Sequence, residues 1–449
     1  MVRKTRSGAE FSPWADAVSP ILLPPEIDVD ALVDRALQED ARREEESDFK
    51  DDLQLEDPLA PSTAFETPTT TPSAANPTPS RDKRRSKARR KGKREAEDDP
   101  SHTNVKKIAL KRVAESNPLH TSLITDELRV ASSGWVGLRR RKEIREKRLY
   151  SLEEMLRPSS GFMLIEWDGL TPRPIVDGKD RVVAVLVGRP RDPGWAALSN
   201  DVFTTISKAR DRCTFSQDQA DHRRGQFPTL SIGTSFGGGQ CRAGNLASTP
   251  ANKTVLEELL KEKCIQRIAN FAARSFAAFA PRLYEYYAMT IDTLFKSDTS
   301  LRQNFPNNPL PCTAINFGPQ VQCLPHFDIA NLPFGWCTIS AFGHFDPVRG
   351  GHIVLWDLGL VIQFPPGSTI DIPSAIFEHS NVTIAENETR ISFTQYAAGG
   401  LFRWVANGMQ TDKQLAASDP EKKRELDRAK AGRWERGLSM FSTLTELLA

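Results

Sequence analysis

Residues 325–404 read PHFDIANLPFGWCTISAFGHFDPVRGGHIVLWDLGLVIQFPPGSTIDIPSAIFEHSNVTIAENETRISFTQYAAGGLFRW. Near the start of this stretch one residue separates His326 from Asp328, and His379 and Arg390 follow further along. Two neutral imidazoles and one carboxylate can hold Fe(II) on one face of its octahedron and leave three positions open. Because an arginine pairs with a carboxylate through two parallel hydrogen bonds, Arg390 can anchor a 2-oxoglutarate that chelates the iron. The set therefore predicts the site of a non-haem Fe(II) oxygenase that uses 2-oxoglutarate.

The local pattern places these residues on strands. Residues two apart on an extended segment point to the same side, so His326 and Asp328 are expected to face the metal together. Residues 368–381 (STIDIPSAIFEHSN) are predicted to form a buried strand that ends at the metal. Residues 388–396 (ETRISFTQY) alternate polar and apolar positions, as a strand does. The polar positions of that strand are expected to face a cavity: Arg390, Ser392, Thr394 and Tyr396.

The order of the remaining patterns predicts the fold class. Short strands between Pro and Gly turns dominate residues 313–404, and a more helical region precedes them. We expect strands over 161–167 and 182–188, a helix over 195–212, and two helices over 256–295 that break near Pro281. Helices followed by a strand-rich half indicate an α+β fold, with a double-stranded β-helix (jelly-roll, cupin-like) core buttressed by helices.

The chain divides by composition into four parts. Residues 1–105 are acidic, then rich in Pro, Ser and Thr, then basic, and such segments bury too little apolar surface to order, so this tail is predicted to be disordered. Residues 106–159 are predicted to be a partly ordered helical linker. The dioxygenase domain is expected over 160–407, with its β-helix core at about 313–404. Residues 408–449 look like a charged helical tail that either packs on the domain or contacts a partner.

The charge distribution and the cysteine content limit the classes of protein to which this chain can belong. The net charge of the 449-residue chain is only +2, but residues 81–95 hold ten Lys or Arg, which favours nuclear import or contact with a phosphate backbone. Six cysteines include no Cys-x-x-Cys pair, so neither a zinc knuckle nor a disulfide framework is indicated. We expect no signal peptide and no membrane span, because no apolar run is long enough.

Residues 325–404 closely resemble the fungal, transposon-associated branch of the ten-eleven-translocation and base-J-binding-protein dioxygenases. The likeness extends more faintly upstream to about His222, through HRRGQFPTLSIGTSFGGGQ. Members of this family oxidise methyl groups of pyrimidines in DNA. The resemblance implies that His326, Asp328 and His379 are the iron ligands.

The same resemblance assigns roles around the metal. Arg390 and Ser392 correspond to the anchor for the 2-oxoglutarate carboxylate. Asn331 stands where relatives place an asparagine that hydrogen-bonds the target base, and Tyr396 where they place an aromatic residue that stacks on it. The chain departs from the family at Ala398, where relatives have a base-contacting histidine, so the preferred base stays open.

One further cofactor contact is suggested by the segment that leads into the metal ligands. Residues 313–324 (TAINFGPQVQCL) resemble a strand that brings an asparagine to the oxo-acid in nucleic-acid demethylases of the same superfamily. Asn316 is therefore a candidate contact to 2-oxoglutarate. The alternative is an ordinary turn asparagine before Gly318.

The resemblance implies an enzyme that uses Fe(II), 2-oxoglutarate and O2, and the basic run predicts that it is nuclear; we expect it to be a monomer. It would flip 5-methylcytosine or thymine out of methylated DNA and oxidise the methyl group to hydroxymethyl, and further where the reaction repeats. Two alternatives stay open: an oxygenase of the same fold that acts on N-methylated bases, RNA or protein, and a catalytically silent chromatin-binding or transposon-accessory module. The complete His, Asp, His and Arg set counts against the silent module.

Overall fold

The computed structural model describes residues 3–4, 10–11, 111–138, 147–238 and 240–448. Almost all of the tail over 1–105, including the basic run 81–95, lies outside the described residues, and its disorder remains a prediction. The chain forms two compact units, Met1–Asp40 and Ala41–Ala449. In the first unit, β1 (Arg3–Lys4) and β2 (Glu10–Phe11) pair antiparallel.

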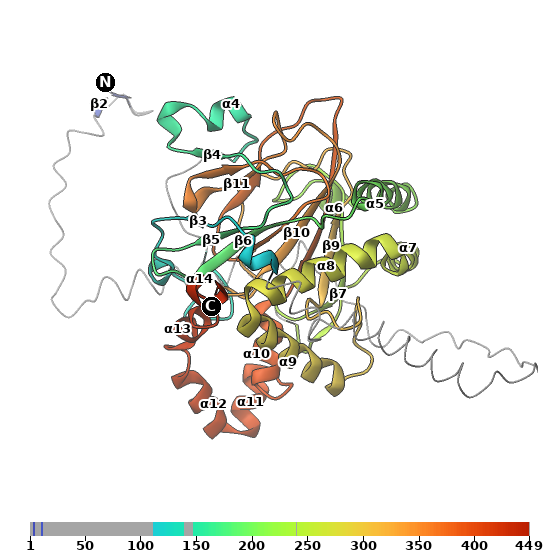
Figure 1. The fold of residues 1–449 in the computed structure, drawn as a ribbon. Helices are drawn as coiled ribbons and strands as arrows, with labels where there is room; N and C mark the ends of the chain where they lie inside the picture. The colour runs from blue at the N-terminus through green and yellow to red at the C-terminus, as the bar shows by residue number, and fades with distance from the viewer. Residues whose placement is uncertain (1–2, 5–9, 12–110, 139–146, 239, 449) are drawn as a thin grey trace, which may run out of the picture. The chain divides into compact units, whose positions relative to one another are not determined.

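The second unit is a mixed α/β structure with two sheets (Figure 1). The larger sheet has the order β3 (Leu119–His120), β5 (Arg173–Val176), β6 (Val182–Gly188), β13 (Thr369–Ile372), β10 (Cys337–His344), β15 (Thr389–Tyr396), β9 (Cys312–Asn316), β7 (Thr229–Ser235) and β8 (Gly244–Asn245). The smaller sheet has the order β14 (His379–Asn381), β11 (Ile353–Leu355), β12 (Leu360–Ile362) and β4 (Met163–Ile165). The strands predicted over 161–167 and 182–188 are present as β4 and β6.

The strands of the C-terminal half are divided between the two sheets, and the chain crosses from one sheet to the other several times. β9, β10, β13 and β15 belong to the larger sheet, whereas β11, β12 and β14 belong to the smaller one. His326, between β9 and β10, bridges antiparallel to His379 at the start of β14. The chain therefore passes back and forth between the sheets, and this winding brings residues from distant parts of the sequence to one cavity.

The prediction of one strand over 368–381 is wrong, because this segment forms two strands in different sheets. β13 ends at Ile372, and a turn follows in which Pro373 accepts hydrogen bonds from the backbone N–H groups of Ile376 and Phe377. Because a proline has no N–H to donate, it cannot continue the hydrogen bonds of a sheet, and the strand in the larger sheet ends before it. The turn redirects the chain to the smaller sheet, where β14 begins at His379.

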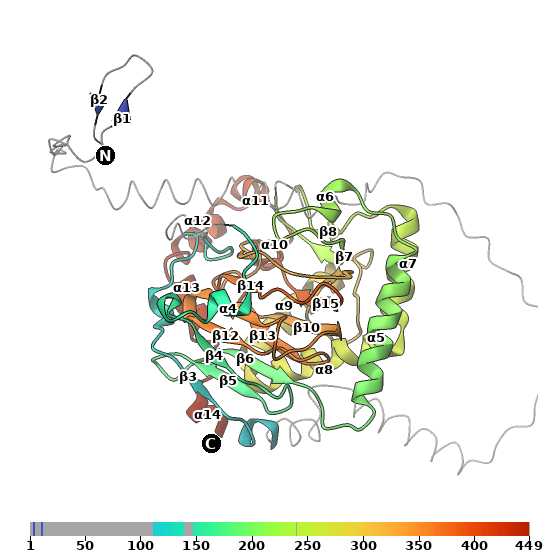
Figure 2. The same ribbon diagram turned by 90° about the horizontal axis from the view of Figure 1, so that it is seen from above.

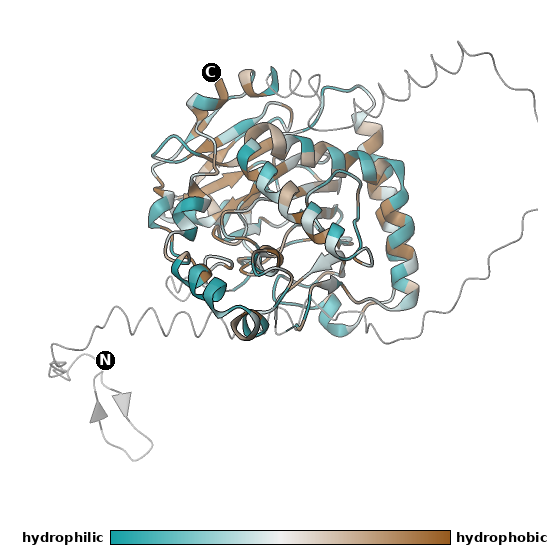
Figure 3. Cartoon of the chain, turned by 90° about the horizontal axis from the view of Figure 1, so that it is seen from below, coloured by the Kyte–Doolittle hydropathy of each residue, from teal (hydrophilic) through white to brown (hydrophobic). Residues whose placement is uncertain are grey.

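Helices cover one face of the larger sheet. They are α5 (Trp195–Arg210), α7 (Pro250–Lys261), α8 (Lys263–Phe279) and α9 (Pro281–Ser297), and the short α6 (Gln217–Ala220) precedes β7. Side chains of α5, α7 and α8 share one hydrophobic cluster with Ile315, Phe342 and Phe393 of the sheet. Figure 2 shows α5 and α7 running along the same side of the strands. In Figure 3 the hydrophobic residues gather on the strands inside the molecule.

The helical region differs from the prediction in its divisions. The break near Pro281 is confirmed, but the region contains a third helix because Glu262 takes an extended conformation between α7 and α8. The first helix also begins earlier than predicted, at Pro250, where Thr249 caps it by accepting a hydrogen bond from the N–H of Asn252. A threonine followed by proline is a recognised start of a helix.

The C-terminal segment packs on the domain. It forms α10 (Gly399–Ala406), α11 (Asp412–Ser418), α12 (Pro420–Arg428), α13 (Arg433–Leu438) and α14 (Leu444–Leu448) rather than one charged helix. Leu438, Phe441 and Leu444 are buried in the main hydrophobic core. Of the two alternatives for this tail, the structure therefore shows packing on the domain.

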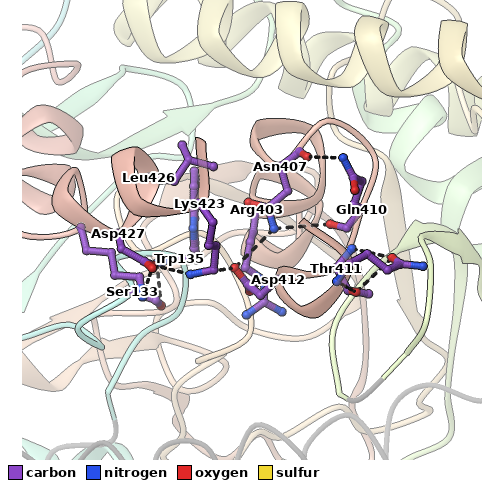
Figure 4. A network of polar contacts seen from close by, with 12 residues as sticks. Ser133, Trp135, Arg403, Asn407, Gln410, Thr411, Asp412, Lys423, Leu426 and Asp427 are labelled. Carbon is purple, nitrogen blue, oxygen red and sulfur yellow. Dashed lines mark hydrogen bonds and ion pairs between the residues drawn. The ribbon is translucent and has the colours of Figure 1, made fainter. Parts of the chain in front are cut away.

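Polar contacts also tie this segment to the rest of the domain (Figure 4). Asp412 lies 3.8 Å from Arg403 and 3.8 Å from Lys423. The guanidinium of Arg433 lies 4.2 Å from the ring centroid of Trp135 and donates to the carbonyl of Ser133. The helices α10 to α13 are thus linked to one another and to the segment that precedes residue 138.

The described part of residues 106–159 is mostly irregular, unlike the helical linker that we predicted. It contains a helical stretch over 111–114, β3, α4 (Leu152–Met155), the 3-10 helix Thr125–Glu127 and the start of a second 3-10 helix, Pro158–Ser160. Val113, Leu128 and Trp135 belong to the main core, so this stretch is part of the domain. Within the described ranges we find no helix that is both long and apolar enough to span a membrane.

Candidate metal and anion site

The structure brings the three predicted metal ligands together. The ligand atoms of His326, Asp328 and His379 all lie within 4.8 Å of one another. The Nε2 atom of His326 is 3.8 Å from one carboxylate oxygen of Asp328, and the Nε2 atom of His379 is 3.7 Å from the other. Both histidines are buried, whereas the Asp328 side chain keeps some exposure. Two imidazoles and one carboxylate therefore converge on one point.

In each histidine, the hydrogen bond made by the other ring nitrogen, Nδ1, determines the tautomer of the neutral ring. Nδ1 of His326 lies 2.8 Å from the carbonyl oxygen of Leu324, and Nδ1 of His379 lies 3.0 Å from that of Phe377. A carbonyl only accepts, so each Nδ1 carries a proton, and in the neutral ring this tautomer leaves the lone pair on Nε2, where a metal can bind. Burial, and then the neighbouring His379 and Arg223, hold the pKa of His326 well below its usual value. His326 is therefore neutral, as a metal ligand must be.

Arg390 is a buried cation in the same region. It lies on β15 opposite Gly343 of β10 and is only 1% exposed. Its guanidinium donates to the carbonyl of Val321 at 3.0 Å and to Oδ1 of Asn381 at 3.4 Å, and its Nε has no hydrogen-bond partner. Burial lowers the pKa of Arg390 to about 10, so the group still carries its charge at neutral pH.

The charge of Arg390 lacks a counter-ion among the described residues. No described carboxylate lies within ion-pair distance of it, and its neighbours include the rings of Phe345 and Phe364, at 5.9 and 5.8 Å from the guanidinium. An unpaired buried charge is costly, so a protein that keeps one has a ligand or a function for it. The surroundings of Arg390 therefore fit the binding of an anion.

Ser392 and Asn316 lie next to this cation. Ser392 is two residues after Arg390 on β15, and its Oγ accepts a 2.8 Å hydrogen bond from Nδ2 of Asn316 on β9. Thr229 on β7 in turn donates to Oδ1 of Asn316 at 2.8 Å. Sequence reasoning missed Thr229, which lies inside the stretch that resembles the dioxygenase family but carries no motif.

One cavity contains both the predicted metal ligands and the buried arginine. Of the polar face predicted for residues 388–396, Arg390, Ser392 and Thr394 line this cavity, and Tyr396 does not. Apart from the metal ligands and Asn316, the remaining lining residues were not predicted to belong to the site, among them Arg224 and Cys323. The full lining consists of Arg224, Asn316, Cys323, His326, Asp328, Ile339, Ile353, Phe364, His379, Ser380, Asn381, Arg390, Ser392 and Thr394.

Arg223, for which the sequence predicted no role, reaches the metal ligands. It donates to the carbonyl of Phe327 at 3.0 Å, and its guanidinium lies 3.8 Å from Asp328. An arginine thus braces the loop that supplies two of the three ligands. The pair of arginines in HRRGQF is the signal that could have indicated this contact.

The two residues predicted to contact a base lie outside the lining of this cavity. The side-chain amide of Asn331 donates to Oγ of Ser374 at 3.1 Å, and its backbone bridges to Ala398. Tyr396 ends β15 opposite Cys312 of β9 and is half-buried. Two positions at which relatives contact the base, Asn331 and Ala398, are therefore neighbours here, and the base-binding roles stay predictions.

A larger cleft of about 540 Å³ lies elsewhere, between the end of β6, α5 and the end of β10. Its lining includes Arg189, Arg191, Trp195 and His344 and none of the predicted site residues. Arg189 donates to the carbonyl of Pro366, and Arg191 lies 3.6 Å from a glutamate carboxylate. Because these cations already have partners, we place the candidate site at the metal ligands and Arg390.

No family model matches the sequence, and no curated protein matches it. Among solved structures, the chain is similar to NgTET1 in complex with 5mC DNA, at 16% identity and a TM-score of 0.37, over 53% of this chain and 83% of that one. It is also similar to an oxidoreductase of the 2OG-Fe(II) oxygenase family from Burkholderia pseudomallei, at 17% identity and a TM-score of 0.27, over 47% of this chain and 93% of that one. At this level of similarity, the function of the site has to be inferred from its own residues.

Proposed function

We propose that the protein is an Fe(II)- and 2-oxoglutarate-dependent dioxygenase that oxidises the methyl group of 5-methylcytosine, or of thymine, in DNA. One observation carries the reaction class. A buried arginine without a described carboxylate partner shares a single cavity with two histidines and an aspartate. A metal site and an anion site in one buried cavity are what a chelating oxo-acid requires.

The donor set fits Fe(II). His326 and His379 would each offer a neutral Nε2, and Asp328 would offer a carboxylate oxygen. Three protein ligands of these types on one face leave room for a bidentate co-substrate and for O2. Arg223, braced against Phe327, would hold Asp328 in place for the metal.

The rest of the cavity fits 2-oxoglutarate. Arg390 would pair with its distal carboxylate, and Ser392 and Asn316 would add hydrogen bonds next to that pair. The apolar walls suit the two methylene groups between the carboxylates, and they keep water from the reacting centre. These walls are formed by Ile339, Ile353 and Phe364.

The bound iron, 2-oxoglutarate and O2 would supply the oxidising chemistry. The chain's own residues would orient the metal and the co-substrate and would compensate the negative charge of the co-substrate. The two Nδ1 hydrogen bonds hold both imidazoles with Nε2 aimed at one point, and the guanidinium of Arg390 would neutralise the distal carboxylate in a buried environment. By holding the co-substrate in one pose, these residues would reduce the entropy cost of aligning it for the reaction.

The double-stranded β-helix core is part of this proposal. Its support is the division of the strands between two sheets, with β9, β10, β13 and β15 in one and β11, β12 and β14 in the other. In a jelly-roll of this kind a ligand site forms at the open end between the two sheets. His326 and His379 bridge at the edge of the smaller sheet and Arg390 lies on the larger one, so the candidate site spans both.

The DNA substrate rests on the resemblance of residues 325–404 to the methylpyrimidine dioxygenases. Asn331 and Tyr396 occupy the positions of the base contacts, and the basic run 81–95 would provide nuclear import or backbone contacts. A nuclear location is proposed on the same basis. The small, buried Ala398 beside Asn331 removes the histidine of the relatives, so N-methylated bases or RNA are the second candidate substrate class.

The test uses the purified full-length chain with Fe(II), 2-oxoglutarate and a duplex oligonucleotide that carries 5-methylcytosine. We expect succinate to form only when all components are present, and nucleoside mass spectrometry to detect 5-hydroxymethylcytosine. Parallel reactions contain DNA in which thymine is the only base with a 5-methyl group, DNA with N6-methyladenine, and methylated RNA. Turnover confined to the last two would reject the pyrimidine assignment, and a chain that binds neither iron nor 2-oxoglutarate would reject the enzyme.

A further inference from the structure

Three polar side chains form a continuous hydrogen-bonded chain across adjacent strands. Asn316 of β9 lies directly opposite Thr229 of β7 on one side and Ser392 of β15 on the other. Thr229 donates to Oδ1 of Asn316 at 2.8 Å, and Nδ2 of Asn316 donates to Oγ of Ser392 at 2.8 Å. All three residues are buried, and Asn316 and Ser392 line the cavity beside Arg390 whereas Thr229 does not.

The donor-to-acceptor direction of these hydrogen bonds determines whether Ser392 can donate a hydrogen bond into the cavity. Oγ of Ser392 already accepts a hydrogen bond from Asn316, so its own O–H is available to donate a hydrogen bond into the cavity. If the amide of Asn316 were rotated by half a turn, its oxygen would face Ser392 and accept the hydrogen bond from that O–H. The lone pairs of Ser392 would then face the cavity and repel a carboxylate.

Thr229 selects between these two arrangements. A hydroxyl that donates to Oδ1 of Asn316 favours the orientation in which Nδ2 faces Ser392. In the rotated orientation Nδ2 would face Thr229, and the buried threonine hydroxyl would lose the acceptor that it has now. Leaving a buried donor without a partner is costly enough to favour one orientation strongly.

We propose that Thr229 is a positioning residue for 2-oxoglutarate, which acts through Asn316 to make Ser392 a hydrogen-bond donor toward the distal carboxylate. The inference rests on the proposed function, because it assumes that the anion beside Arg390 is 2-oxoglutarate. Thr229 itself does not line the cavity.

The test compares two substitutions at this position in the full-length chain. Thr229→Val keeps the shape of the side chain and removes the hydroxyl, and Thr229→Ser keeps the hydroxyl. The protein is loaded with Mn(II), so that no turnover occurs, and 2-oxoglutarate is titrated by calorimetry. We expect Thr229→Val to raise the Kd for 2-oxoglutarate by about fivefold, the loss of roughly one hydrogen bond, and Thr229→Ser to stay near the wild-type value.

Oxalate separates positioning from a general disturbance, because it chelates the metal but has no distal carboxylate. We expect wild type and Thr229→Val to bind oxalate equally. The effect of Thr229→Val on 2-oxoglutarate should also disappear in a Ser392→Ala background, since the hydroxyl that it orients is gone.

Two results would overturn the inference: an unchanged Kd for 2-oxoglutarate in Thr229→Val, or an equal weakening of oxalate and 2-oxoglutarate. Either result leaves the proposed function intact as long as the wild-type chain binds 2-oxoglutarate. A wild-type chain that binds oxalate with Mn(II) but not 2-oxoglutarate would instead reject the co-substrate, and with it both proposals.

Discussion

The backbones of His326 and His379 exchange two hydrogen bonds, with N to O distances of 3.1 and 3.0 Å, although 53 positions separate them in the sequence. This isolated antiparallel pair holds the two imidazole rings with their centroids 4.2 Å apart. The backbone therefore sets the spacing of the two nitrogen ligands, so the site is largely formed before a metal binds.

Removing one nitrogen ligand should abolish stoichiometric metal binding. His379→Ala leaves one imidazole and one carboxylate, too few donors to hold Fe(II) tightly. We expect the metal content, measured by mass spectrometry after anaerobic loading and dialysis, to fall from about one ion per chain to near zero. The exposed His120 provides the matched control, so His120→Ala should load like wild type. Equal metal content in His379→Ala would place the metal elsewhere.

Arg390→Met should weaken the binding of 2-oxoglutarate without lowering the stability of the folded protein. The substitution removes the partner of the distal carboxylate, and we expect the affinity for 2-oxoglutarate to fall by about tenfold to a hundredfold. It also removes a buried charge that has no described carboxylate partner, so the melting temperature of the metal-free variant should not fall. The control is Arg349→Met at an exposed arginine, which should change neither quantity. Tight 2-oxoglutarate binding by Arg390→Met would exclude Arg390 as the anchor.

The buried His352 should make the folded protein sensitive to acid. Burial lowers its pKa from 6.5 to about 4, so between these values the unfolded chain binds a proton that the folded chain does not. Stability is therefore lost as the pH falls from about 6.5 toward 4, by about 2 kcal/mol between pH 7 and pH 5 from this group. Denaturant titrations should show that His352→Leu reduces the loss by about this amount, whereas His120→Leu does not. The same pH dependence in both variants would contradict the assignment.

The C-terminal helices should contribute to the stability of the domain. Phe441 is 1% exposed and lies 6.4 Å from the ring of Trp336, so Phe441→Ala should lower the free energy of unfolding by roughly 3–5 kcal/mol. Leu448, in the neighbouring α14, is 53% exposed, and Leu448→Ala should change the free energy by less than about 0.5 kcal/mol. Similar small effects of both substitutions would show that this segment does not pack on the domain in solution.

The sequence located the candidate site well but did not resolve its surroundings. The spacing of His326, Asp328 and His379 predicted one cluster, which the structure forms. Alternation over 388–396 predicted the strand β15 with Arg390 and Ser392 on the cavity side, because a period of two is a local property of a strand.

Other features could not be read from local patterns. The segment 368–381 was predicted as one strand, but the turn at Pro373 sends its two halves to different sheets. Arg223 and Thr229 carry no motif, and their roles depend on contacts with Asp328 and Asn316, which lie about a hundred positions away.

The sequence by itself determined which chemical groups are present: two imidazoles and a carboxylate at fixed spacing, an arginine on an alternating strand, and an asparagine before them. It could do so because ligand type and side-chain direction within one strand are local properties. Only the tertiary structure decided that Arg390 is buried without a described carboxylate partner, that both Nδ1 atoms face backbone carbonyls, and that Thr229 reaches Ser392 through Asn316. Charge compensation and hydrogen-bond direction depend on neighbours that are close in space and distant in the chain.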